Sequence, residues 1–267
     1  MKKISLGAAL CSLTLSASSS AVTTLTGGEI RTAGSWDNGV PDATDDGTIS
    51  TNGTVGGNFN GNVGGTSEAR FVNTTVTQTA GTITGIFNTA GAAGLVWNMT
   101  GGTINNAAGN FNANSGAIFN FTGGNLIFGA DLIVNNVSGG ISVGGTATLS
   151  TADDFDLRLN QDNAFLSIGL DWTGSFVSGN DVTEADWIAE LVFGAGPAGS
   201  GGTAANPLRQ MDVAGTPIDE TNFGSFFTVT PGGGGGSSLT LTNPVPEPSS
   251  ALLLGLASLG LLKRRRQ

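Results

Sequence analysis

A repeat in the middle of the chain restricts its fold more than any other feature. The stretch "VWNMTGGTI", from Val96 to Ile104, aligns position by position with "IFNFTGGNL", from Ile118 to Leu126. One step earlier, "VTQTAGTI" at 76–83 fits the same pattern at nearly the same spacing. Short alternating apolar runs are separated by Gly and Asn corners, without a helical period. The repeat predicts a mainly β chain with a short right-handed parallel β-solenoid, because no single coil can bury its inward face alone.

Each coil is expected to hold two or three short strands. Asn98 and Asn120 occupy the same position of the repeat and predict an asparagine ladder along the stack. The glycine pairs supply the positive-φ turns between faces. An antiparallel β-sandwich with coincidental similarity between the repeats is the alternative. The residues expected to face the core, either themselves or through the neighbours with which they alternate along the strand, are Val96, Met99, Ile104, Ile118, Phe121 and Leu126.

The pattern changes after Ser150, and residues 151–243 predict a small α+β cap on the repeats of 22–150. "FDLRLN" and "LSIGLDW" alternate apolar and polar residues around a Gln-Asp-Asn turn, which predicts an antiparallel hairpin with Asp156 as charge partner of Arg158. A helix is expected over 183–193, capped by Thr183 with Asp186 three residues on, with Trp187, Ile188 and Leu191 facing the core. "FFTVT" and "SLTLT" predict two further strands around a turn at 231–236.

Residues 1–21 have the order of a secretory signal peptide. A basic start at Lys2 and Lys3 is followed by an apolar run and by small residues, which predicts cleavage after Ala21. Cys11 raises a lipoprotein alternative, but Leu10 stands where a small residue is required. Once the signal is removed no cysteine is left, so the stability of the chain cannot depend on disulfides.

Residues 244–267 combine a Pro-Glu-Pro corner, an apolar helix and a basic tail. The apolar run 251–262 is about 18 Å long as a helix, which spans a bilayer core of roughly 30 Å poorly. Four cations follow it and would hold that end on the cytoplasmic side. A plain tail anchor and a buried core helix are the alternatives to a sorting signal. The basic anchor consists of Lys263, Arg264, Arg265 and Arg266.

The corner, the helix and the basic tail together resemble the PEP-CTERM sorting signal of Gram-negative bacteria. The resemblance implies that a membrane-embedded exosortase recognises and cleaves the tail, and that both termini anchor the chain transiently. It also implies that the product reaches the cell surface or extracellular matrix and associates with exopolysaccharide. A weaker resemblance links "GSWDNGVPDATDDGTIS" at 34–50, expected to be an exposed loop before the first strand, to autotransporter-like β-helix passengers. The sorting motif comprises Val245, Pro246, Glu247, Pro248 and Ser249.

Composition limits the chemistry of the chain. Between residues 22 and 243 four arginines face 19 acidic residues, a net charge of −15, which excludes nucleic acid as a partner. Histidine and tyrosine are absent, so the usual general base and the commonest metal ligand are missing. We expect neither catalytic residues nor a metal or cofactor. Two acidic groups, Asp42/Asp45/Asp46 and Asp153/Asp154/Asp156, suggest calcium by residue type, but neither has the spacing of a calcium loop.

The sequence therefore predicts an exported, non-enzymatic surface or matrix protein. One alternative is a carbohydrate-binding adhesin in which Trp36, Trp97 or Trp172 stacks on sugars, although Trp97 and Trp172 have the pattern of core residues. The other is a β-helix polysaccharide lyase with Arg70 or Arg158 as base. The lyase is disfavoured because Asp131 is the sole acid between Arg70 and Thr151.

Overall fold

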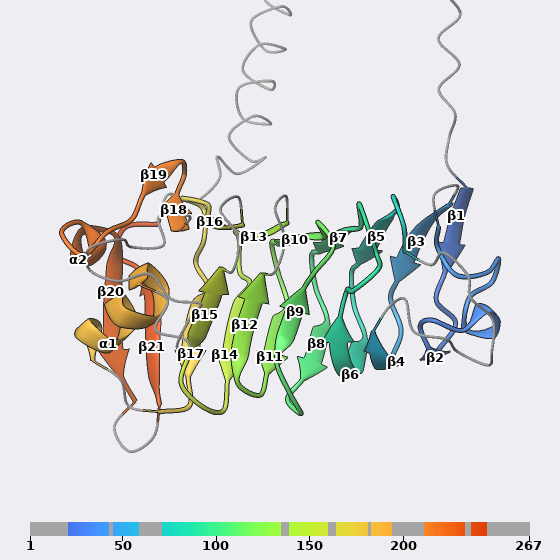
Figure 1. Cartoon of the computed structure of the whole chain (residues 1–267), viewed down its shortest axis with the longest axis horizontal. Helices are drawn as coiled ribbons and strands as arrows, with labels where there is room; N and C mark the ends of the chain where they lie inside the picture. Colours follow the sequence, from blue (N-terminus) through green and yellow to red (C-terminus); the bar gives the residue numbers. More distant parts are fainter. Residues whose placement is uncertain are drawn as a thin grey trace, which may run out of the picture.

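Parallel strands wind into a mainly β solenoid of about six turns, with few helices. The computed structural model describes residues 21–42, 45–58, 71–134, 139–159, 164–180, 183–193, 211–232 and 236–244. The coils follow one another along the long axis of the molecule, from β1 at one end to the α1, β20 and β21 region at the other (Figure 1). The predicted solenoid is confirmed; its handedness stays a prediction.

The first ladder is a nine-stranded sheet whose strands follow one another along the stack. All its pairs are parallel except the last, β18 with β19. The spacing of the sequence repeat places Val96 beside Ile118 and Ile118 beside Gly140. In spatial order the strands are β1 (Ala21–Thr24), β3 (Asp45–Ile49), β5 (Thr75–Gln78), β7 (Val96–Met99), β10 (Ile118–Phe121), β13 (Gly140–Val143), β16 (Phe165–Ile168), β18 (Met211–Val213) and β19 (Thr216–Pro217).

The second and third ladders belong to one 12-stranded sheet, because β6 runs through both. The second ladder is β2 (Gly28–Glu29), β4 (Gly53–Asn58), β6 (Thr82–Asn88), β8 (Thr103–Asn106), β11 (Asn125–Phe128), β14 (Thr148–Thr151) and β17 (Ser175–Ser178), all parallel. The third is β6, β9 (Phe111–Ala113), β12 (Asp131–Val134) and β15 (Asp156–Leu159), also parallel.

Side chains alternate between the core and the surface along each strand. Of the predicted inward residues, Met99, Ile104, Phe121 and Leu126 are buried. Val96 lies outward and half-buried, and its neighbour Trp97 points inward instead. Ile118 is half-buried for the same reason. The core holds a chain of aromatic rings whose neighbours lie 4.9–6.5 Å apart between centroids: Phe87, Trp97, Phe111, Phe119 and Phe121.

The outward Asn98 and Asn120 form the predicted ladder. They are paired in register, and Asn120 Nδ2 donates to Asn98 Oδ1 over 2.8 Å.

Glycines stack at the corner between the first and second ladders. Gly81, Gly102, Gly124 and Gly145 all have positive φ, between 52° and 82°. A Cβ on Gly102 would lie 2.5 Å from the carbonyl oxygen of Gly81 in the preceding coil. Glycine is needed here both for the turn and for the close approach of successive backbones.

The N-terminal end is closed by the segment that follows β2. It contains a short 3-10 helix, η1 (Ala33–Ser35), and Trp36 forms an antiparallel bridge with Leu25. The Asp37 carboxylate accepts a hydrogen bond from Thr24 N of the edge strand, over 2.6 Å. The predicted exposed loop before the first strand is therefore wrong at this point: β1 and β2 precede it, and Trp36 is buried.

Parallel pairing continues past Ser150, so the predicted hairpin is wrong. β15 pairs with β12, and β16 pairs with β13, both parallel. The predicted alternation of apolar and polar residues is present in β15 and β16, but strands of successive parallel coils show the same alternation as the two strands of a hairpin. β16 ends at Ile168, which leaves Leu170 exposed, whereas Trp172 is buried and donates to Ala147 O.

The C-terminal end is covered by helices and an antiparallel pair. α1 (Glu184–Ile188) starts with the predicted cap, in which Thr183 accepts from Asp186 N and the Asp186 carboxylate accepts from Thr183 N. It continues as a π-helix, η2 (Ala189–Phe193). Trp187 and Leu191 are buried, as expected. The remaining elements are α2 (Phe223–Phe226), β20 (Phe227–Pro231) and β21 (Ser237–Leu241), with β21 antiparallel to both β17 and β20.

Candidate functional site

The predicted sorting residues lie outside the described part of the chain. This holds for Val245, Pro246, Glu247, Pro248, Ser249 and for the basic anchor Lys263, Arg264, Arg265 and Arg266. Of the predicted signal segment, Ala21 alone is described; it is the first residue of β1 and is paired with Asp45 of β3. β21 ends at Leu241, so the folded cap ends shortly before residue 244.

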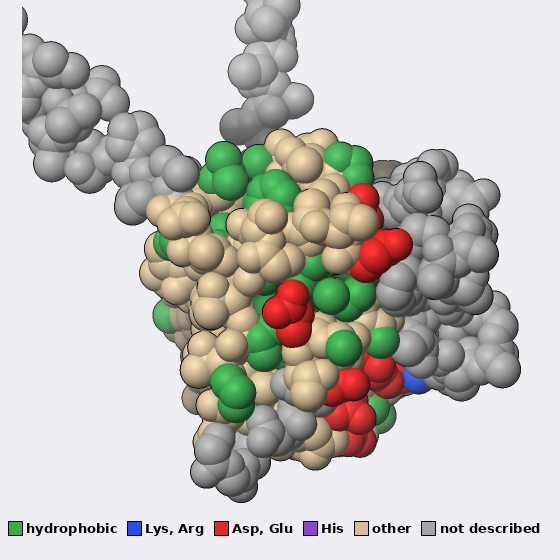
Figure 2. Space-filling view, turned by 90° about the vertical axis from the view of Figure 1, so that its left-hand side faces the viewer, with side chains coloured by type: hydrophobic (Ala, Val, Ile, Leu, Met, Phe, Trp, Pro, Cys, Tyr) green, Lys and Arg blue, Asp and Glu red, His purple; other side chains and the backbone are tan. Residues whose placement is uncertain are grey.

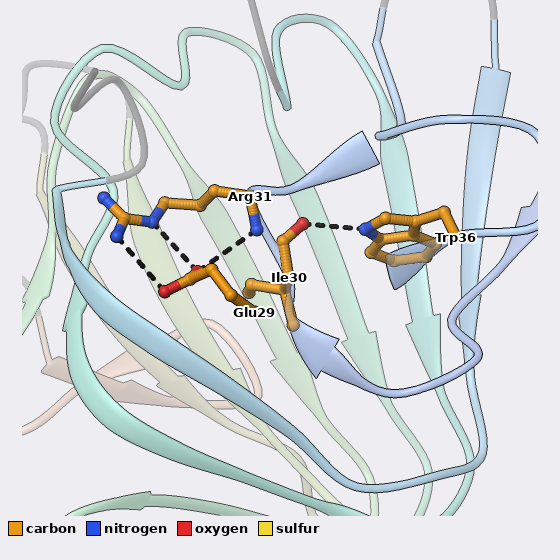
Figure 3. Close-up of polar contacts among 4 residues, drawn as sticks. All are labelled: Glu29, Ile30, Arg31 and Trp36. Atoms are coloured by element: carbon orange, nitrogen blue, oxygen red, sulfur yellow. Dashed lines mark hydrogen bonds and ion pairs between the residues drawn. The ribbon is translucent and has the colours of Figure 1, made fainter. Parts of the chain in front are cut away.

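The tryptophans belong to the core and do not form a sugar platform. Trp97 and Trp172 are fully buried, as their pattern predicted. Trp36, predicted in a loop, is 4% exposed; its Nε1 donates to Ile30 O over 2.7 Å beside the Glu29–Arg31 ion pair (Figure 3). The stacking mode proposed for Trp36, Trp97 and Trp172 is therefore wrong.

The two acidic groups do not form calcium loops. Asp45 and Asp46 lie in strand β3, and Asp46 accepts a hydrogen bond from Thr75 N of the neighbouring coil. Asp153 and Asp154 both accept from Asn180 Nδ2. Within the described ranges, no group of three or more Asp, Glu, His or Cys residues has the arrangement to hold a metal ion.

The most perturbed side chains gather where η2 lies against β15. Arg158 Nη2 lies 2.6 Å from Asp131 Oδ1 and 3.9 Å from Asp156 Oδ2, so Asp131 on the adjacent strand is a closer partner than the predicted Asp156. Arg158 Nε and Glu190 Oε2 are buried and have no hydrogen-bond partner among the described residues. Acidic side chains collect along one side of this end of the molecule (Figure 2).

Burial raises the pKa of two carboxyl groups, Glu190 and Asp131, in a carboxylate–arginine cluster that consists of Asp131, Asp156, Arg158 and Glu190. Desolvation raises the pKa of Glu190 to about 8, and the hydrogen bond and negative charge of Asp156 add to the rise. Desolvation also raises the pKa of Asp131, with Asp156 acting in the same direction and Arg158 opposing it. Glu190 is thus a neutral acid near pH 7.

The cluster has the chemistry of a clamp between the solenoid and its cap. Lyase chemistry needs a neutral arginine as base, whereas Arg158 forms an ion pair with Asp131, with 2.6 Å between Nη2 and Oδ1. Arg70, the other candidate base, lies outside the described residues. Neutral Glu190 lets η2 lie close to Asp156 without charge repulsion.

We expect stability to fall as pH rises through the pKa of Glu190. Between about 4.5 and about 8 the folded chain keeps a proton that the unfolded chain releases, so the stabilisation is complete below 4.5 and is lost on passing 8. Partial solvation reduces the change to roughly 1–2 kcal/mol. The measurement is thermal unfolding of the purified protein from pH 5 to pH 9.

Two glutamate-to-glutamine variants control this experiment. Glu190→Gln removes the titrating group and should flatten the pH profile, whereas Glu220→Gln, an exposed position in the cap, should leave the slope unchanged. An unchanged slope in Glu190→Gln would show that Asp154, Asp156 and Asp186, the other acids facing Glu190, control the profile instead.

The outer face of the second ladder carries no charged residue from β4 to β17, a feature that was not predicted from the sequence. A hollow of about 490 Å³ opens on this face, lined by Gly28, Asn52, Gly53, Thr54, Thr82 and Thr84. The detectable signal was a Thr, Asn or Ser on both sides of a buried apolar residue, as in "TIT" at 82–84 and "TIN" at 103–105.

Comparisons with known proteins identify the C-terminal segment. No curated protein and no solved structure matches the chain. No helix in the described ranges is long and apolar enough to cross a membrane. Residues 244–267 match the family model described as the PEP-CTERM protein-sorting motif. Residues 244–267 therefore carry a PEP-CTERM sorting motif, and this motif implies an exported protein that is processed by an exosortase.

Proposed function

We propose that the chain is a non-enzymatic structural protein of the Gram-negative cell surface or extracellular matrix, associated with exopolysaccharide. The sorting motif at residues 244–267 carries this proposal, since it addresses the chain to an exosortase. In the proposed route, the signal peptide is cut after Ala21, the apolar helix at 251–262 holds the chain transiently in the membrane, and the exosortase cleaves near Pro246–Pro248.

The solenoid supports a structural role. Its stacked coils hold one another by continuous backbone hydrogen bonds, and their core is filled by aromatic and aliphatic side chains. The body between residues 22 and 243 has a net charge of −15 and lacks histidine and cysteine. Such a body is suited to remaining dispersed and chemically inert outside the cell.

Substitution of the Pro-Glu-Pro corner tests the proposed export and cleavage by the exosortase. We expect the Pro246→Ala, Glu247→Ala, Pro248→Ala triple variant to accumulate uncleaved in the membrane fraction, because the exosortase loses its recognition motif. C-terminal mass spectrometry of the membrane, surface and medium fractions measures this. The wild-type protein should be recovered outside the cell without its basic anchor.

Asn243→Ala, an exposed residue just before the motif, is the control and should be processed normally. Recovery of the wild-type chain in the cytoplasm, or outside the cell with residues 244–267 intact, would refute the route.

A further inference from the structure

We propose that the outer face of the second ladder, from β4 to β17, binds a neutral polysaccharide chain lying along the stack. The inference rests on the proposed function, which brings the protein among exopolysaccharide, and it names the surface and the class of ligand. We call this surface the threonine face. Its residues point outward on either side of a buried row, Ile83, Ile104, Leu126, Leu149 and Phe176.

Two straight rows of short side chains make up the threonine face, and strand register aligns them. The first row is Thr82, Thr103, Asn125, Thr148 and Ser175. The second row is Thr54, Thr84, Asn105, Ile127, Ser150 and Val177. Every one of these residues is exposed or half-buried.

The spacing of the rows is set by the backbone. Neighbouring strands lie about 4.8 Å apart, and residues two apart on one strand lie about 6.6 Å apart. The six strands thus present a grid about 24 Å long, enough for several sugar rings in a row. Threonine is stiff at χ1, so little side-chain freedom is lost when a ligand binds to the grid.

The hydrogen-bonding groups of this face are available to a ligand. Across the described ranges, the hydroxyls of Thr54, Thr82, Thr84, Thr103 and Thr148 make no hydrogen bond within the chain. On the first ladder, by contrast, Asn98 is bonded to Asn120, and Ser167 Oγ donates to Asp212. Hydroxyls that both donate and accept are matched to the hydroxyls of a sugar.

Charge selects a neutral ligand. The two rows contain no charged residue from β4 to β17, although the chain has 20 acidic residues. The third ladder carries Asp131, Asp156 and Arg158, and the first carries Asp46 and Asp212. Ile127 and Val177 add apolar contact for the C–H groups of a sugar ring. An acidic polysaccharide would be repelled by the surrounding negative charge.

The threonine face is tested by removing hydroxyls without changing shape. Thr82→Val, Thr84→Val and Thr103→Val together replace three hydroxyls by methyl groups on three neighbouring positions of the grid. Binding of the purified exported protein to microcrystalline cellulose is measured by sedimentation, and binding to a soluble neutral β-glucan by affinity electrophoresis. We expect the triple variant to bind at least tenfold more weakly.

A matched triple variant lies on the first ladder: Thr48→Val, Thr75→Val and Thr77→Val, three half-buried threonines of β3 and β5. It should bind as the wild-type protein does. Thermal unfolding checks that both variants remain folded. Alginate, an acidic polysaccharide, should not be bound by either.

Three outcomes would overturn the inference: no binding of the wild-type protein to either neutral glucan, equal losses in the two triple variants, or binding to alginate alone. C-terminal mass spectrometry of the same samples separates this failure from failure of the proposed function. If the protein is exported and cleaved correctly but does not bind neutral glucan, the proposed binding by the threonine face is wrong and the proposed export and cleavage still hold.

Discussion

Replacing Gly102 by alanine is expected to destabilise the solenoid by about 3 kcal/mol or more. Gly102 has a φ of +82°, where alanine is strained, and its new Cβ would lie 2.5 Å from Gly81 O and 2.7 Å from Ala80 C. Both atoms belong to the backbone of the preceding coil, which cannot move without breaking the ladder at that point. Chemical denaturation monitored by circular dichroism measures the loss.

Three further glycine-to-alanine variants separate the two causes. Gly116 has a φ of +74° but open space around it, so only the backbone strain of about 1–2 kcal/mol applies. Gly101 has no positive φ, but its Cβ would lie 2.4 Å from Thr79 O, so only the close approach applies, about 1–3 kcal/mol. Gly109 has neither and should be unaffected. Equal stabilities of Gly102→Ala and Gly109→Ala would contradict the stacked corner.

Trp187→Ala is expected to detach the cap and to destabilise the chain by about 3–5 kcal/mol. Trp187 is fully buried, its ring centroid lies 5.4 Å from that of Phe155, and its Nε1 donates to Ser237 Oγ over 3.1 Å. The side chain thus joins α1, the last coil of the third ladder and β21. Without it, the end of the solenoid exposes apolar rings and unpaired backbone, which promotes self-association.

Denaturation together with light scattering measures both effects of Trp187→Ala. Ser237→Ala is the control, since it removes only the hydrogen bond. It should lower the free energy of unfolding by about 1 kcal/mol without causing self-association in light scattering. A loss in Trp187→Ala no larger than in Ser237→Ala would show that the cap is held by other contacts.

The stacking of the coils could be predicted from sequence because it depends on local repetition. The sequence spacing between Val96 and Ile118 is the strand register itself, and it also aligned Asn98 with Asn120. The direction of the side chains was less clear, because Val96, Trp97 and Met99 are all apolar. Period-two alternation with the outward Asn98 resolves it: Val96 shares the side of Asn98, and Trp97 lies opposite.

The contacts between distant segments could not be predicted. Arg158 meets Asp131 because β12 and β15 are stacked, and Glu190 meets Asp156 because η2 packs against β15. Alternation in residues 155–172 is identical for a hairpin and for successive coils, so the hairpin prediction had no local evidence against it. The sorting motif was predictable because an exosortase reads a linear signal that does not depend on the fold.

The repeating coil also makes the molecule adjustable in length. Deleting residues 96–117 would join the start of one coil to the identical position of the next, and duplicating them would add one strand to every ladder. Each deletion or duplication changes the length of the solenoid by about 4.8 Å, while the N-terminal closure and the C-terminal cap stay unchanged. Unequal recombination could therefore lengthen or shorten the solenoid by whole coils without changing the sequence of either end.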